Sequence, residues 1–169
     1  DNGDGGTIAS NADLGIRAGS LGNAQGNILH AGDGRLDIDA DTLRSENGSI
    51  ASNGKLTLKG DTTDLTGATT QAKAIKVDTG VLTTTKGKLI ASGTGPLEFK
   101  VRGAMDNNGG IVAGNGAVDL RAKSLDNRGG TVSAAGTKAT RLIVTDKLDN
   151  SDGTVAAAGD TTVKAGALV

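Results

Sequence analysis

Positively charged side chains recur at one place in the sequence pattern, and they are the first candidates for a binding function. The place is the residue that follows the second of two alternating apolar residues, as Lys100 follows Leu97 and Phe99. Successive copies of the pattern place there Arg17, Asp39, Lys59, Asp78, Lys100, Arg121, Thr145 and Lys164. Lys100, Arg121 and Lys164 are the best stretch for contacting a polyanion. Signs alternate through the first five copies, and opposite charges on adjacent strands attract by roughly 0.2–1 kcal/mol per pair. A solvated face with paired charges is the competing interpretation.

Catalysis and metal binding find little support in the residue types present. His30 is the only histidine and cysteine is absent, so His30 cannot begin a zinc site or a catalytic triad. Residues 37–41 imitate the start of a calcium loop, but the glycine and the distal glutamate of that motif are missing. Glutamate occurs only at Glu46 and Glu98, and no cluster suited to a polysaccharide lyase or hydrolase stands out. We predict no catalytic residue, no metal and no cofactor.

Asparagine and other small polar residues recur at a second place, two residues after an apolar position. The residues found there are Asn23, Ser45, Thr84, Asn107, Asn127 and Asn150. Asparagine side chains that stack on one another can form a hydrogen-bonded ladder. We predict a structural ladder that includes Asn23, Asn107, Asn127 and Asn150. Independent turn residues are the alternative, and both interpretations are structural.

Both patterns are parts of a repeat of about twenty residues. The first glycine of a Gly-x-apolar element serves as a marker, and the markers are Gly6, Gly26, Gly48, Gly67, Gly87, Gly110, Gly130 and Gly153, separated by 19 to 23 residues. Two residues after each marker lie Ile8, Ile28, Ile50, Thr69, Leu89, Val112, Val132 and Val155. A fixed period in this range indicates a stacked repeat architecture.

Each repeat contains two further apolar elements. The first alternates with period two: Leu14/Ile16, Leu36/Ile38, Leu56/Leu58, Ile75/Val77, Leu97/Phe99, Val118/Leu120, Leu142/Val144 and Thr161/Val163. The second is a single position: Leu21, Leu43, Leu65, Leu82, Met105, Leu125, Leu148 and Leu168. Period-two alternation marks strands with one buried face, and no window shows helical spacing. We predict an all-β parallel β-helix of about eight coils of 19–23 residues, with three short strands in each coil.

One coil departs from the pattern. The stretch 61–74 is polar and rich in threonine, and Leu65 lies only two residues before the marker Gly67. We predict an irregular coil or a bulged loop in this stretch.

Composition limits the partners. The formal net charge is −1, so there is no bulk attraction to nucleic acid, and no nucleic-acid partner is predicted. The absence of cysteine is compatible with the cytosol or with a secreted protein that is stabilised without disulfides.

The units Leu-Asp-Asn-x-Gly-Gly-Thr-Val-x-Ala-Ala-Gly point to a known family. Residues 125–136 and 148–159 match this unit closely, and residues 105–114 match it more loosely. At these units the chain resembles the haemagglutinin repeats of filamentous haemagglutinin and related two-partner-secreted exoproteins. The resemblance implies a right-handed β-helical shaft on a Gram-negative cell surface, exported unfolded through an outer-membrane transporter. It also implies roles in adhesion to host cells or in biofilms, and some relatives deliver toxins for contact-dependent inhibition.

We therefore interpret residues 1–169 as one β-helical segment of a longer shaft in a secreted surface adhesin. Its predicted partners are its own neighbouring coils, the export transporter and a host receptor or glycan. One alternative is a shaft that itself binds sulfated, heparin-like glycans, and another is the stalk of a contact-dependent inhibition toxin. The terminal coils are expected to expose unpaired strand edges.

Overall fold

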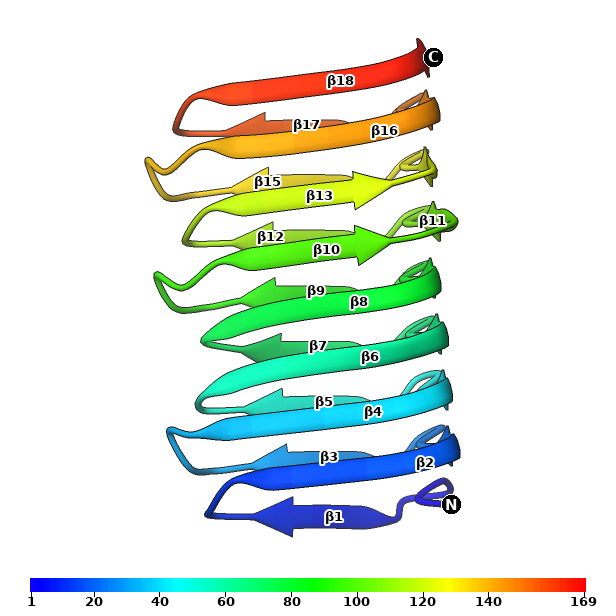
Figure 1. The fold of residues 1–169 in the computed structure, drawn as a ribbon, viewed down its shortest axis with the longest axis vertical. Helices are drawn as coiled ribbons and strands as arrows, with labels where there is room; N and C mark the ends of the chain where they lie inside the picture. Colours follow the sequence, from blue (N-terminus) through cyan, green and yellow to red (C-terminus); the bar gives the residue numbers. More distant parts are fainter.

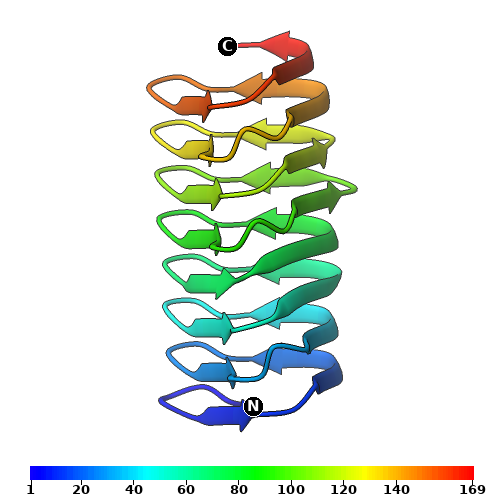
Figure 2. The same ribbon diagram turned by 90° about the vertical axis from the view of Figure 1, so that its left-hand side faces the viewer.

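The computed structural model describes all residues 1–169 and shows a right-handed parallel β-helix (Figure 1). The coils stack along one axis with the two termini at opposite ends, and the side view shows every coil in the same orientation (Figure 2). The chain contains no helix, and consequently none that could cross a membrane. The predicted all-β solenoid of eight coils is confirmed.

One side of the molecule is a parallel sheet of eight strands, which we call face A. Each strand has four residues and pairs in register with the same strand of the next coil. The strands are β1 (Thr7–Ser10), β3 (Asn27–His30), β5 (Ser49–Ser52), β7 (Thr69–Ala72), β9 (Lys88–Ala91), β12 (Ile111–Gly114), β15 (Thr131–Ala134) and β17 (Thr154–Ala157).

The other two sides belong to a second, ten-stranded sheet that bends around a corner. In six coils one long strand covers both sides: β2 (Leu14–Gly22), β4 (Arg35–Arg44), β6 (Lys55–Asp64), β8 (Ala74–Thr83), β16 (Thr140–Asp149) and β18 (Thr161–Leu168). In two coils the sides are separate strands: β10 (Leu97–Val101) with β11 (Ala104–Asp106), and β13 (Val118–Ala122) with β14 (Ser124–Asp126). We call the first side face B and the second, which includes 42–44, 104–106 and 124–126, face C.

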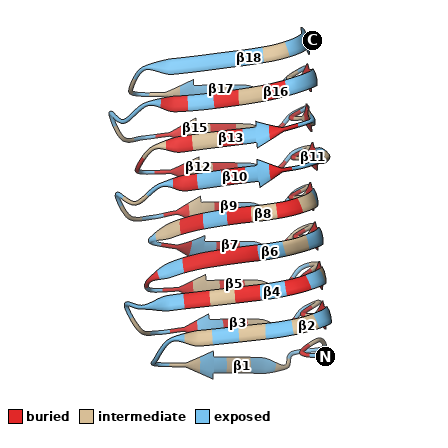
Figure 3. Cartoon of the chain, in the orientation of Figure 1, coloured by how far each residue is buried: buried red, intermediate tan, exposed pale blue.

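The core is a thin column of aliphatic side chains. A single cluster of 31 buried hydrophobic residues runs through the stack, and Phe99 contributes its one aromatic ring. Burial alternates along the face B part of most internal strands, because successive side chains of a strand point to opposite sides of the sheet. In β6 the outward Thr57 is buried as well. The inward side chains are almost fully buried in the middle coils (Figure 3). Those of β1 are half-buried, and β18 is exposed except for the half-buried Ala165. Each coil therefore depends on its neighbours to cover its apolar side chains.

Loops between faces A and B account for part of the variation in coil length. The connection is the single residue Lys73 between β7 and β8, but it takes five residues at 92–96 and at 135–139. Because these loops lie outside the ladder, they lengthen a coil without disturbing the pairing of the strands on either side.

The stretch 61–74, for which we predicted an irregular coil, is instead paired in register on both sides. β6 pairs with β8 as far as Asp64, and β7 pairs with β5 and β9. The marker that we assigned to this coil from the repeat pattern was wrong by one residue. Ala68, not Gly67, takes the marker position, and Thr70 lies opposite Ile50 and Leu89. Thr63, not Leu65, takes the third apolar position, opposite Leu43 and Leu82.

Regular pairing is possible here because threonine has the size and β-branching of valine. Thr63 and Thr70 are almost fully buried, and the Thr63 hydroxyl lies 3.2 Å from Thr79 Oγ1 at hydrogen-bond distance. Substituting threonine for an aliphatic residue therefore leaves the strand geometry unchanged.

Candidate functional site

The corner between faces C and A contains a row of buried polar side chains that link one coil to the next. Asn107 Nδ2 donates to Asn127 Oδ1 at 2.7 Å, and Asn127 Nδ2 donates to Asn150 Oδ1 at 2.6 Å. Thr84 Oγ1 donates to Asn107 Oδ1 at 2.8 Å, which extends this run by one coil. Asn107 and Asn127 have no solvent exposure, so these bonds satisfy groups that water cannot reach.

A second, shorter run of the same ladder lies near the N-terminus. Asn2 Nδ2 donates to Asn23 Oδ1 at 2.7 Å, and Asn23 Nδ2 donates to Ser45 Oγ at 2.8 Å. Asn23, Asn107, Asn127 and Asn150 thus lie in one row, but Leu65 occupies the position between Ser45 and Thr84 and divides the row. Leu65 was not predicted at this corner, because the repeat pattern placed it at the apolar position of face C, with Leu43 and Leu82.

The marker glycines are required by the same corner. A Cβ atom on Gly130 would collide with the carbonyl oxygen of Asn107, and one on Gly153 would collide with that of Asn127. From Gly26 onward each marker amide also donates to the backbone carbonyl of the ladder residue of its own coil, as Gly130 N does to Asn127 O at 3.0 Å. The residue before each marker has a positive φ, for example Gly129 at 60°. The corner is therefore a tight turn with no space for a side chain at Gly130 or Gly153, whereas the corner at Leu65 accommodates the methyl group of Ala68.

The aspartate before the asparagine faces outward and closes the turn from the other side. Asp126 Oδ1 accepts from the backbone amide of Arg128 at 3.0 Å, and Asp149 Oδ1 accepts from that of Ser151 at 3.2 Å. The Arg128 side chain also bonds Asp126, and this contact holds the pKa of the carboxyl below its ordinary value. The pKa of Asp149 is lowered by hydrogen bonds from the Lys147 and Ser151 side chains. The Asp-Asn pair therefore has two structural roles, one outward and one inward.

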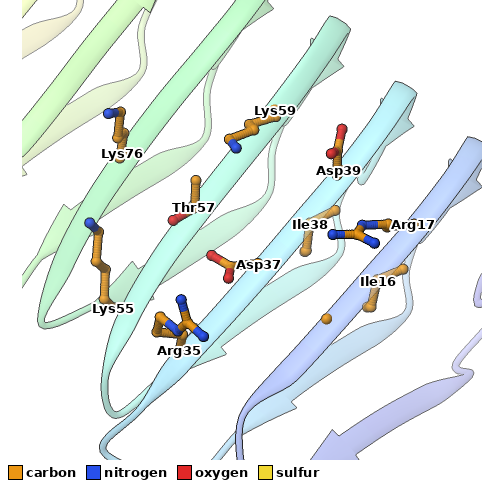
Figure 4. A pocket seen from close by; sticks show the side chains of 11 residues that line it. Ile16, Arg17, Arg35, Asp37, Ile38, Asp39, Lys55, Thr57, Lys59 and Lys76 are labelled. Carbon is orange, nitrogen blue, oxygen red and sulfur yellow. The ribbon is translucent and has the colours of Figure 1, made fainter.

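A depression of the surface lies on face B, over β2, β4, β6 and β8 (Figure 4). It is a hollow of about 710 Å³ that forms where Gly15 and Thr57 replace longer outward side chains. We call it the cationic hollow. Its charged lining residues are Arg17, Arg35, Asp37, Asp39, Lys55, Lys59 and Lys76.

Most cations of the hollow have no carboxylate partner. Only Arg35 forms an ion pair, with Asp13 at 3.5 Å on the neighbouring loop. Positive residues outnumber negative ones here, although the whole chain has a net charge of −1. Because these cations come from four successive strands, the arrangement suits an anionic ligand that runs along the shaft axis, across the strands.

The chain matches the family model of the haemagglutinin repeat over residues 1–36, 32–94, 92–152 and 149–169. The chain belongs to the haemagglutinin repeat family. Neither a search of curated proteins nor a search of solved structures gave a significant match. The Leu-Asp-Asn-x-Gly-Gly unit of these haemagglutinin repeats thus has a structural explanation in the buried amide ladder, the outward aspartate and the marker glycine.

The cations that we selected from the sequence are less available than those of the hollow. Lys100 pairs with Asp78 at 3.7 Å, and Arg121 pairs with Asp119 at 3.0 Å. Lys100 and Arg121 are adjacent in the ladder, but Ile143, not Thr145, lies opposite Arg121 and separates it from Lys164. The strand predicted for this coil was placed two residues too late, because Thr140 takes the inward position opposite Val118, where the pattern led us to expect an aliphatic residue.

His30 is buried on face A at a position taken by Ser52 in the next coil. Its Nδ1 lies 2.9 Å from Ser52 Oγ, and its Nε2 has no partner. No group of three or more histidine, aspartate or glutamate side chains is arranged to hold a metal ion. His30 is thus a single buried side chain bonded to its neighbouring coil.

Proposed function

We propose that this chain is a shaft segment of a large secreted bacterial surface adhesin, where it acts as a rigid spacer for a distal binding domain. Haemagglutinin repeats are a structural kind of unit found in the shafts of secreted, adhesin-type proteins. The observation that supports a spacer most directly is the continuous parallel pairing of both sheets through all coils, around a single continuous core. The register shifts between Val144 and Lys147, where β16 pairs with β18.

The stacking gives the shaft a defined length per coil. Neighbouring strands lie about 4.8 Å apart, so eight coils span on the order of 38 Å. Every added coil of the same type extends the rod by the same step, because each contacts only its neighbours. A long series of such coils would hold a distal domain well away from the cell.

The remaining parts of the proposal concern export and presentation. We infer that the parent protein passes unfolded through an outer-membrane transporter and folds at the cell surface. The absence of cysteine is consistent with such a route, since no disulfide has to form. The same shaft would serve as the stalk of a contact-dependent inhibition toxin, and the distal domain distinguishes the two roles.

Removing one whole coil tests the spacer proposal. Residues 110–129 make one coil, since Ile111 lies opposite Thr131. Their deletion should give a folded protein that is shorter by about 4.8 Å in small-angle scattering. Deletion of 110–119 alone should abolish folding, because it joins strands from different faces. The spacer proposal also expects no saturable binding of the purified chain to host cells, and such binding would contradict it.

The cationic hollow favours a second candidate function, binding of sulfated glycans by the shaft itself. The observation behind it is the absence of ion pairs at Arg17, Lys55, Lys59 and Lys76. The triple variant Lys55→Gln/Lys59→Gln/Lys76→Gln should elute earlier from heparin at physiological salt than the parent chain. The control Lys100→Gln/Arg121→Gln removes cations that already have partners and should elute unchanged. Equal elution of the parent chain and the triple variant would contradict this candidate.

A further inference from the structure

Face A differs from face B in having almost no charge on its outer side. Each of its strands directs two side chains outward, and these form two columns along the shaft. They are Thr7, Ala9, Asn27, Leu29, Ser49, Ala51, Thr69, Gln71, Lys88, Ile90, Ile111, Ala113, Thr131, Ser133, Thr154 and Ala156. Lys88 is the one charged residue among them.

Face B shows the opposite composition on strands of the same coils. Its outward charged residues are Arg17, Arg35, Asp37, Asp39, Lys55, Lys59, Lys76, Asp78, Glu98, Lys100, Asp119, Arg121, Arg141 and Lys164. Charged side chains keep a protein surface hydrated, and nearly all the charged side chains of these two faces lie on face B. Leu29 and Ile111, two of the six exposed large hydrophobic residues, lie on face A at 40% and 37% exposure.

We propose that face A packs against face A of a second copy of this chain, so that two shafts pair side by side. A charged partner would lose hydration against this surface without gaining an opposite charge, so the partner surface has to be uncharged. It also has to repeat at the strand spacing of about 4.8 Å. The same face of another copy meets both conditions, and a surface that pairs with itself forms a closed dimer.

The side chains of face A fit such a contact. Alanine, leucine and isoleucine would lose exposed apolar area, while threonine, serine, asparagine and glutamine can hydrogen-bond across the interface. Lys88 is the first residue of β9, directly after the corner, so its amino group can reach water at the edge of the contact. No other outward side chain of the face would bring a charge into the interface.

The available area predicts weak pairing for this segment and stronger pairing for a longer shaft. Eight strands at about 4.8 Å and four residues at about 3.3 Å give a face of roughly 500 Å², or roughly 1,000 Å² for two copies. Stable specific interfaces usually bury about 1,200 Å² or more in total. The segment should therefore dimerise only at high concentration, and each further coil would add area in proportion. This inference does not depend on whether the shaft presents an adhesin or a toxin.

Two matched substitutions test the proposal. Ile90→Glu adds a charge to the middle of face A, and Ile143→Glu adds the same charge at an equally half-buried outward position of face B. Sedimentation equilibrium up to about 1 mM should show a monomer–dimer equilibrium that Ile90→Glu weakens at least tenfold and Ile143→Glu leaves unchanged. Thermal unfolding of the two variants should be alike, because both side chains face outward.

Spin labels locate the contact, and the absence of native cysteine allows a single label to be placed. A nitroxide at Gln71→Cys, in the middle of face A, should show dipolar broadening at concentrations where dimers form. A nitroxide at Glu98→Cys, on face B, should show none. The proposal would be overturned by a strictly monomeric chain. It would also be overturned by a dimer that shows no broadening at Gln71 and no effect of Ile90→Glu, which is the result expected if the chains associate through their end coils.

Discussion

The corner at Asn127 and the corner at Leu65 occupy the same place in different coils but are filled in opposite ways. At the first, Leu125 fills the inward position of face C and Asn127 joins the amide ladder. At the second, the small Thr63 takes the inward position and the large Leu65 takes the corner. Both leucines and Thr63 are almost completely buried, and the strands on either side keep their register.

The difference shows that the corner must conserve volume and satisfy its buried groups, but it need not use asparagine. Exchanging the small and large residues within one coil keeps the total volume nearly constant, and cores tolerate such exchanges. The ladder stops at Ser45 and resumes at Thr84, whose hydroxyl groups are short enough to end a run. A buried apolar residue at a single corner therefore leaves no asparagine without a partner.

Asn127→Leu should cause the largest loss of stability in this comparison. It places a leucine at the corner, as at Leu65, while the large Leu125 still fills the inward position that the smaller Thr63 takes in the other coil. The substitution leaves Asn107 Nδ2 without its acceptor and Asn150 Oδ1 without its donor. The buried Asn107 amide should cost about 2 kcal/mol and the half-buried Asn150 amide somewhat less, so the free energy of unfolding should fall by about 3–4 kcal/mol. Urea denaturation measures the change, and a loss below about 1 kcal/mol would show that the ladder contributes little.

Gly130→Ala should be the next most damaging change. Its Cβ atom would collide with the Asn107 carbonyl oxygen, so two coils would have to separate at the corner, at a cost of about 3 kcal/mol. The matched change at the Leu65 corner is Ala68→Gly, which removes a methyl group and should cost only about 1 kcal/mol. Comparable urea midpoints for the two variants would refute this account of the marker position.

Leu65→Asn should cost about 2 kcal/mol, since the lost apolar volume outweighs a new bond to Ser45 or Thr84. The double variant Thr63→Leu/Leu65→Asn restores the arrangement found at Asn127 and should recover at least half of that loss. A double-mutant cycle built from urea denaturation of the two single variants and the double variant gives the coupling between the sites. Additive effects would mean that the two positions do not exchange volume.

The smallest expected effect is the loss of stability in acid that comes from protonation of the outward aspartates Asp126 and Asp149. Folding lowers the pKa of Asp126 and Asp149, so their contribution is complete above the unfolded value of about 3.9 and is lost as the pH falls below it. Asp149→Asn should reduce the decrease in Tm between about pH 5 and pH 2, although modestly because the pair is exposed. Asp64→Asn at the Leu65 corner is the control, because Asp64 accepts hydrogen bonds only from Thr66. Thr66 and Ser151 make the same two bonds to their aspartates, so an equal response of both variants would show that the bond from Lys147 does not matter.

Much of the fold could be predicted from the sequence because the relevant signals are local. Period-two alternation, such as Leu36/Ile38, follows from strand geometry, and a glycine at each turn follows from the tight approach of the preceding coil. These signals recur in every coil, so errors in one repeat do not hide the architecture. The row of Asn107, Asn127 and Asn150 was visible for the same reason.

Alignment between coils was less accessible, and only the tertiary structure decided it. The marker in the fourth coil was misassigned because Leu65 and Thr63 had exchanged roles, and a local pattern cannot show which of two inward positions receives the larger side chain. The strand of the seventh coil was placed two residues too late because a threonine, Thr140, takes the inward position opposite Val118 that the pattern gave to Leu142.

Side-chain partners across coils also required the folded chain. Arg102 bonds Asp78 at 2.7 Å and Asp61 at 3.2 Å, residues 24 and 41 positions away, and no local pattern relates them. The cationic hollow depends on the absence of side-chain bulk at Gly15 as much as on its lysines. The sequence alone determined a stack of strands with an apolar interior, because alternation and turns are properties of neighbouring residues. Tertiary structure decided which charges are paired and which face is uncharged, because these depend on contacts between residues one or two coils apart.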